Sequence, residues 1–303
     1  IIKVQSVKMK ELKDGIAYIR ISQFQEHTAD DLAKYLIDLN KKNHLNGLVL
    51  DLRNDPGGLL NAAVGVVSTF IDKDKVVVST KGRTAEANRS FLTRPSDYLN
   101  FDQSPSSDWV AKVPKEAKTV PMVVLINAAS ASASEIVSGA LQDHKRAKII
   151  GQQSFGKGSV QTVLPLRPLD GGEATTGIKL TTSRYYTPNG RSIQAKGITP
   201  DIEIADTAEG NYATFNIREA DLAHHLKSEE EKKAFQKKQK EESEKQLDDA
   251  KQPELRYFFG DDKDFQLQQA VKILKGEKYI TGFEKKPEVT KENPKKTEGQ
   301  TKK

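Results

Sequence analysis

The spacing of apolar residues predicts alternating strands and helices in the first two-thirds of the chain. Residues 1–7 and 15–21 have short strand-like patterns. An amphipathic helix follows, with a capping signal at Thr28 and apolar residues at helical spacing from Leu32 to Leu39. This order of elements is typical of an α/β protein.

Two strand–loop–helix units form the centre of the pattern. A buried strand at 47–52 ends in the turn sequence 53–58 and gives way to a helical pattern from Leu59 to Ile71. The strand at 120–126 repeats this design, since it runs into 128–134 and then into a second apolar helix. Because α/β folds place their sites at such element ends, these loops are expected to contribute to one site.

The rest of the chain divides into a β-rich part and a charged part. A short strand at 148–150, the glycine loop 151–158 and β-patterned runs at 159–166 and 178–187 come first, whereas 81–118 shows no firm period. We therefore expect 81–118 to be a long loop or small subdomain. The predicted organisation has three parts: a core over 1–210, a charged helical extension over 211–284 with a short amphipathic helix at 264–274, and a disordered tail over 285–303.

Composition excludes several classes of protein and site. The chain has no cysteine, which rules out disulfides, thiolate metal sites and a cysteine nucleophile. Its net charge of +6 is mild and spread out. The Lys-rich stretches 227–251 and 285–303 alternate with acidic residues and lack regularly interleaved aromatics, so nucleic-acid binding is not expected. No apolar run approaches the roughly 20 residues of a membrane span. The chain opens without a signal-peptide pattern, so we expect a fragment or a processed product.

Two conventional catalytic patterns fit poorly. Residues 151–157 match the first seven positions of a phosphate-binding loop, but Gly158 stands where a serine or threonine is required, and a β-pattern follows instead of a helix. A Ser-His-Asp triad would draw on five histidines, yet no G-x-S-x-G elbow exists. Asp143 and His144 are neighbours on a helix and point about 100° apart. A triad assembled in space stays open, but the sequence does not favour it.

A serine with a lysine base is the third hypothesis. Residues 128–134 supply a turn at a strand end, small neighbours, backbone N–H groups and the positive end of a helix dipole, all of which suit a nucleophilic serine. The same residues fit a simpler role, since Ser132 and Glu135 match a capping box, and Ser130 or Ser134 could be caps. The local pattern alone favours the cap.

Several motifs, in order over roughly 15–205, decide between these interpretations. They are Asp51-Leu-Arg-Asn-Asp-Pro-Gly-Gly58, Ser130-Ala-Ser-Ala-Ser-Glu135, Ala140-Leu-Gln-Asp143, Phe155-Gly-Lys-Gly158, Val160-Gln161, Pro188-Asn-Gly-Arg-Ser-Ile-Gln194 and Gly197-Ile-Thr-Pro-Asp201. With them the chain resembles the C-terminal processing peptidases, or tail-specific proteases. The resemblance implies an α/β core of the crotonase/Clp-protease-like kind with added β-strands, a charged helical C-terminal extension and no cofactor or metal.

The resemblance also assigns roles to residues. It implies that Ser132 is the nucleophile, that Lys157 is the base and that Gln161 assists the lysine. The expected oxyanion hole combines the backbone of Ala133 with that of Gly57 or Gly58, which the sequence does not separate.

Three acidic residues near these motifs receive different expectations. The resemblance suggests that Asp143 supports the site, although an ordinary polar helix end explains it equally well. Glu135 is interpreted as a cap and not as a catalytic acid. No function is attached to Asp55.

The function implied by the resemblance is a serine endopeptidase that cuts protein substrates near their C-termini through an acyl-enzyme. It implies a bacterial envelope or periplasmic location and protein or peptide C-termini as partners. A homo-oligomer or an adaptor protein is compatible with it. Such proteases usually place a PDZ domain before this core, and the expectation here is a protease body without it. The alternative hypothesis is a catalytically silent peptide-binding or scaffold protein of the same fold.

Overall fold

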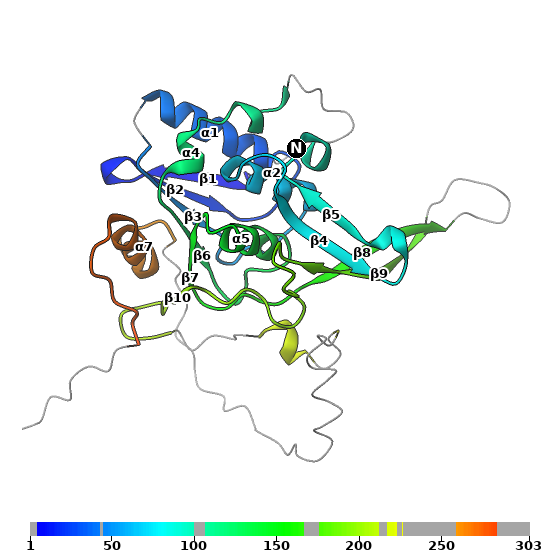
Figure 1. Ribbon diagram of the computed structural model, residues 1–303. Helices are drawn as coiled ribbons and strands as arrows, with labels where there is room; N and C mark the ends of the chain where they lie inside the picture. Colours follow the sequence, from blue (N-terminus) through cyan, green and yellow to red (C-terminus); the bar gives the residue numbers. More distant parts are fainter. Residues whose placement is uncertain are drawn as a thin grey trace, which may run out of the picture.

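The computed structural model describes residues 5–42, 45–99, 107–166, 176–211, 217–222, 226 and 259–283. A six-stranded sheet of order β1-β2-β3-β6-β7-β10 forms its centre (Figure 1). β1 is antiparallel to β2, and the other neighbouring strands are parallel. The strands are β1 (Val7–Glu11), β2 (Ile16–Ile21), β3 (Gly47–Asp51), β6 (Met122–Ile126), β7 (Lys148–Gly151) and β10 (Ile202–Glu203).

Both faces of this sheet are covered, which explains why its strands have continuous apolar patterns. Side chains alternate between the faces, so Leu48 and Leu50 of β3 join one core while Val49 joins the other. The helices of the first face are α1 (Thr28–Lys42), α2 (Leu60–Phe70), α4 (Glu116–Thr119) and α5 (Ala133–Asp143), and α3 (Pro95–Tyr98) packs against α2. The second face is covered by α7 (Phe265–Lys275), which packs on β3 and β6.

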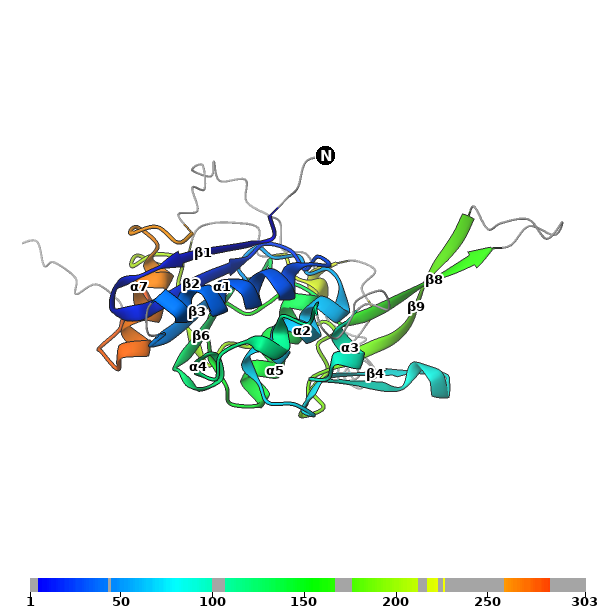
Figure 2. The same ribbon diagram turned by 90° about the horizontal axis from the view of Figure 1, so that it is seen from above.

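A second, antiparallel sheet of order β5-β4-β9-β8 adjoins the first. It consists of β4 (Val76–Gly82), β5 (Arg89–Leu92), β8 (Ser159–Leu166) and β9 (Thr176–Tyr186). Figure 2 shows that β8 and β9 extend away from the body as a two-stranded ribbon. Its two strands carry the largely exposed apolar side chains of Val163, Leu164, Ile178 and Leu180.

Most predicted elements are confirmed, with three differences. The first strand covers Val7–Glu11, so the predicted strand at 1–7 was misplaced, and its residues 1–4 lie outside the described part. Described residues within 81–118 hold the end of β4, all of β5 and short helices, so this stretch is not one long loop. The predicted helix at 264–274 is α7, and it packs on the core sheet instead of standing apart from it.

The predicted division at residue 210 stays a prediction, because most of 211–258 and all of 285–303 lie outside the described residues. The second face of the sheet nevertheless needs α7, since Leu267 and Ala270 are buried against Val123 and Leu125. Within the described ranges, no helix is long and apolar enough to cross a membrane.

Candidate active site

The turn that follows β3 lies directly against the turn that precedes α5. Asn54 and Asn127 join the two by a pair of hydrogen bonds: the Asn54 N–H donates to Asn127 Oδ1 (3.0 Å) and Asn127 Nδ2 donates to Asn54 Oδ1 (2.7 Å). Gly57 has a φ of +97°, and a Cβ built on it would lie 2.8 Å from Ala133 N. The turn therefore needs glycine here both for its backbone conformation and for the close approach to α5.

Two of the three serines in this segment are structural. Ser130 is fully buried, donates to the carbonyl of Leu52 (2.8 Å) and accepts from the Asn127 N–H (3.0 Å). Ser134 is also fully buried and donates to the carbonyl of Asp55 (3.0 Å). These hydroxyls hold the ends of β3 and β6 and the turn after β3 together, so neither is available to a substrate.

Ser132 is the partly exposed member of the triplet. It occupies the N-cap position of α5, and its backbone N–H donates to Glu135 Oε2 (2.8 Å), which is the Glu135 half of the predicted capping box. Its φ of +57° and ψ of −110° are sparsely populated for a residue with a side chain. Such strain costs on the order of 1–3 kcal/mol and collects at functional turns, because there it fixes the direction of a side chain.

The two glycines of the turn differ in what their N–H groups do. The Gly57 N–H donates to Asp55 Oδ1 at 2.8 Å, and is therefore occupied. The N–H groups of Gly58 and Ala133 form no hydrogen bond with any residue that the structure describes. Asp55 is fully buried, and this burial raises the pKa of its carboxyl group to about 7. Asp55 thus has a structural contact at the turn that its sequence gave no reason to expect.

Glu135 connects the serine turn to the glycine loop at 151–158. Its Oε2 accepts from the backbone N–H of Ser132 (2.8 Å) and also from that of Lys157 (2.9 Å). Its Oε1 accepts from Ser154 Oγ (2.6 Å) and from the Gly156 N–H (2.6 Å). One buried carboxylate therefore holds the main chains of Ser132 and Lys157 side by side.

The environment of Glu135 raises its pKa to about 7, because burial outweighs the hydrogen bonds that favour the carboxylate. The sequence predicted only the contact between Glu135 and Ser132, because a capping box is a local pattern. The bonds to the glycine loop join segments about 20 residues apart in sequence, and no local signal could reveal them.

Lys157 lies in a loop shaped by the motif that ends at Gln194. Gln194 Oε1 accepts from the Gly158 N–H (3.1 Å), and the Ala195 N–H donates to the Gly156 carbonyl (2.8 Å). The Lys157 side chain is half-buried, and in the described part of the chain no hydrogen bond joins it to the Ser132 hydroxyl. β8 follows this loop, so the phosphate-loop alternative lacks the helix it requires.

Gln161 and Asp143 lie on different elements around this centre. Gln161 is on β8, opposite Thr181, with an exposed side chain. Asp143 ends α5, about 16 Å along the helix axis from Ser132 at 1.5 Å per residue. Its carboxylate accepts from the Asn189 N–H (2.9 Å) and pairs with Arg191. Asp143 therefore holds the 188–191 turn, and its predicted support of the site would have to act through that turn.

The histidines give no triad among the described residues. The His144 ring is hydrogen-bonded to the carbonyl of Val76 (2.7 Å), and His27 is exposed at the start of α1. His44, His224 and His225 lie outside the described residues. In the ranges that the structure covers, no cluster of three or more acidic or histidine side chains could hold a metal ion.

Comparison with known proteins shows the family of this chain. Residues 15–204 match the family described as Peptidase family S41, which is more than half of the chain. This chain belongs to peptidase family S41. A relative from Bartonella bacilliformis, a carboxy-terminal-processing protease, is 42% identical over 283 residues, covering 91% of this chain and 56% of the relative.

Two further comparisons extend the picture. A probable CtpA-like serine protease of Staphylococcus haemolyticus is 40% identical over 67% of this chain and 36% of its own length. The solved structure of a photosystem II D1 C-terminal processing protease superposes with a TM-score of 0.52 at 28% identity, covering 67% of this chain and 49% of that one. The chain therefore spans between about a third and little more than half of the relatives it matches.

Proposed function

We propose that this chain carries the catalytic core of a serine endopeptidase that cleaves protein substrates near their C-termini, with Ser132 as nucleophile and Lys157 as base. Family membership supports the class of reaction. The observation that carries the residue assignment is the Glu135 carboxylate, because it holds the main chains of Ser132 and Lys157 together.

The proposed reaction uses each group at a defined step. The Ser132 hydroxyl attacks the scissile carbonyl carbon while neutral Lys157 takes its proton, and the proton then passes to the leaving amine. Water hydrolyses the resulting acyl-enzyme with Lys157 again as base. The N–H groups of Gly58 and Ala133, which have no partner in the described structure, would donate to the oxyanion. Gln161 is assigned the task of orienting Lys157.

Formation of the dyad requires movement of the Lys157 side chain toward Ser132. Their main chains are already held by one carboxylate oxygen, so neither loop has to refold. Substrate binding is the natural trigger for this movement, because catalytic hydrogen bonds often shorten only in the substrate complex. The proposed setting is the bacterial envelope or periplasm, with protein C-termini as partners.

Substitutions of the two residues test the proposal. Ser132→Ala removes the nucleophile, and Lys157→Arg keeps a cation that cannot deprotonate at working pH. Both variants should stay folded and lose cleavage of an unstructured protein, while wild type retains it. Substantial cleavage by Lys157→Arg, in preparations where Ser132→Ala is inactive, would contradict the lysine-base assignment.

A catalytically silent peptide-binding protein is the second candidate, because Ser132 and Lys157 share no hydrogen bond in the described structure. It predicts a wild-type protein that binds unstructured peptides without cleaving them and whose Ser132 resists sulfonylation. A time course of sulfonyl fluoride labelling, followed by intact-mass measurement, separates the two candidates.

A further inference from the structure

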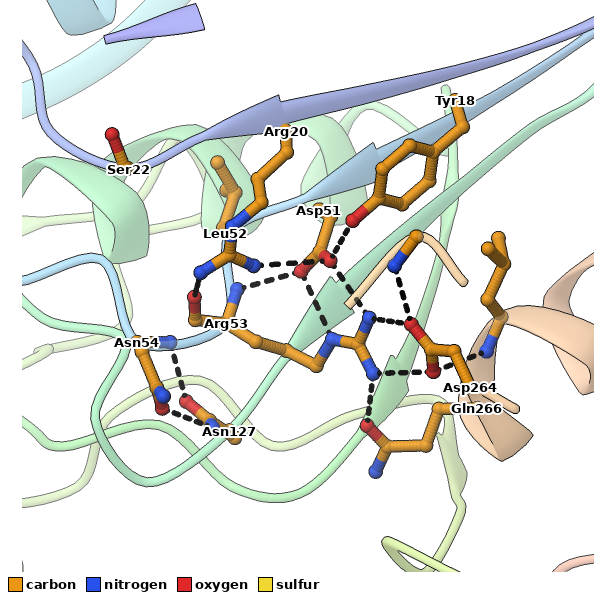
Figure 3. Close-up of polar contacts among 12 residues, drawn as sticks. Tyr18, Arg20, Ser22, Asp51, Leu52, Arg53, Asn54, Asn127, Asp264 and Gln266 are labelled. Atoms are coloured by element: carbon orange, nitrogen blue, oxygen red, sulfur yellow. Dashed lines mark hydrogen bonds and ion pairs between the residues drawn. The ribbon is translucent and has the colours of Figure 1, made fainter. Parts of the chain in front are cut away.

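The turn that carries Gly58 is preceded by a fully buried arginine that binds the C-terminal segment of the chain. Arg53 is 3% exposed and donates to Asp51 through Nε (3.0 Å) and Nη2 (2.7 Å). It also donates to both oxygens of Asp264, from Nη1 (2.9 Å) and Nη2 (2.6 Å), and from Nη1 to Gln266 Oε1 (2.9 Å). Figure 3 shows the guanidinium of Arg53 between the two carboxylates.

The remaining members of the cluster satisfy Asp51 and cover it. Asp51 Oδ2 also accepts from the Tyr18 hydroxyl (2.6 Å) and from Arg20 Nη1 (3.1 Å), and Arg20 Nη2 donates to the Arg53 carbonyl (3.0 Å). The Phe259 ring centroid lies 4.1 Å from the Arg20 guanidinium carbon and 4.3 Å from that of Arg53. Two guanidiniums and two carboxylates thus form a neutral cluster beneath one aromatic ring.

We propose that Asp264 is a positioning residue for the catalytic turn, acting through Arg53 on the backbone that carries Gly57, which lies against Ser132, and Gly58. This inference rests on the proposed role of Ser132. Asp264 lies 211 residues from Arg53 in sequence, so it is not part of any motif that identified the site. A segment at the far end of the chain therefore helps to shape the oxyanion-binding turn.

The connection from Asp264 to the turn is short and made of hydrogen bonds. Arg53 is directly followed by Asn54, which is tied to Asn127, and then by Asp55, whose carbonyl accepts from the Ala131 N–H (3.0 Å). Loss of the Asp264 carboxylate would leave a buried guanidinium with unsatisfied N–H groups and an unbalanced charge. Arg53 would have to move toward another acceptor or toward water, and the main chain of the turn begins at that residue.

Asp264 also has a structural task, which the test has to separate from positioning. Its Oδ1 accepts from the Leu267 N–H (3.1 Å) as the N-cap of α7, and its Oδ2 accepts from the Gly260 N–H (3.0 Å). Asparagine is also a good N-cap, so Asp264→Asn keeps the cap and the shape while removing the charge. Leu267→Ala is the matched control, because it weakens the packing of α7 without touching Arg53.

The test compares these variants in the full chain by kinetics on an unstructured protein substrate, well below their melting temperatures. Asp264→Asn should lower kcat about tenfold or more with KM nearly unchanged, the pattern expected when an interaction of the transition state is lost. Leu267→Ala should lower the melting temperature while kcat stays within about twofold of wild type. Asp264→Glu should recover part of kcat, and Gln266→Ala should lower it less than Asp264→Asn. If Asp264→Asn and Leu267→Ala lose kcat in parallel, the positioning role is overturned.

Amide hydrogen exchange supplies a readout that does not depend on catalysis. The Gly57 and Leu59 N–H groups are hydrogen-bonded to Asp55 Oδ1 and to the Phe24 carbonyl, so their exchange reports on the turn. Asp264→Asn should speed exchange at these two amides more than Leu267→Ala does. Unchanged exchange in Asp264→Asn overturns the inference, even if the protein is inactive. Faster exchange in a protein whose wild type never cleaves would refute the proposed function, but the coupling between Asp264 and the turn would stand.

Discussion

Replacing Glu135 by glutamine tests whether this buried carboxylate organises the site. Glutamine has one acceptor oxygen, so whichever way its amide points, its NH₂ group faces two of the four donors that Glu135 now accepts from. Each buried donor left without an acceptor costs about 1–3 kcal/mol, or about 2–6 kcal/mol for the pair. The substitution also removes a buried charge, which offsets part of this cost.

The size of the offset depends on pH. Burial raises the pKa of Glu135 from 4.5 to about 7 in the folded protein, so the folded state binds this proton more tightly than the unfolded chain does. Wild type therefore loses stability as pH rises from about 4.5 to 7, by about 3 kcal/mol in all at 1.4 kcal/mol per pKa unit. Between pH 5.5 and 8.5 the loss is about 2 kcal/mol. The glutamine variant lacks this dependence, so its deficit in unfolding free energy should shrink by about that amount over this interval.

Urea unfolding of both proteins at pH 5.5 and 8.5 measures this difference, because contributions from other titrating groups such as Asp55 cancel between them. Ser138→Ala serves as control, since it removes a buried hydrogen bond to the Ser134 carbonyl (2.7 Å) in the same helix without touching the Glu135 carboxylate. Its deficit should be the same at both pH values. Activity of Glu135→Gln should fall about 100-fold, since small misplacements of catalytic groups have costs of that order. A deficit independent of pH would refute the reasoning from burial, and wild-type kcat would refute the organising role.

Three other predictions concern residues around this centre. Gln161→Ala should reduce kcat by less than Lys157→Arg does, because nucleophile and base both remain; complete inactivation in the same assay would assign Gln161 a larger role. Asp143→Asn should lower the melting temperature by a few degrees, because it loses the ion pair with Arg191, and kcat should stay within about twofold of wild type. A loss of kcat without a loss of stability would place Asp143 in the site. Deletion of 285–303 should leave melting and cleavage unchanged, and a clear fall in either would show that the tail contributes to the folded protein.

Local patterns in the sequence were enough to predict most elements of the core. The parallel strands are buried on both faces and so are continuous apolar runs, and the helices carry apolar residues at helical spacing. The strand near the N-terminus was misplaced, because Val7–Glu11 alternates buried and exposed residues and only Val7 is fully buried. The hairpin of β4 and β5 was missed. β5 has only four residues, two of them exposed, so it leaves little apolar pattern in the sequence.

The site divides in the same way between sequence and tertiary structure. The roles of Ser132 as nucleophile and Lys157 as base were implied by the family resemblance of the motifs and stay a prediction. The sequence did not separate Gly57 from Gly58. Only the folded structure shows that the Gly57 N–H and the hydroxyls of Ser130 and Ser134 already have hydrogen-bond partners. Hydrogen bonds over long sequence separations also decided the roles of Glu135 and Asp264. The sequence does not distinguish a carboxylate that caps a helix from one that binds a distant loop. Its hydrogen-bond partners depend on how elements far apart in the chain pack together, and no local pattern encodes that packing.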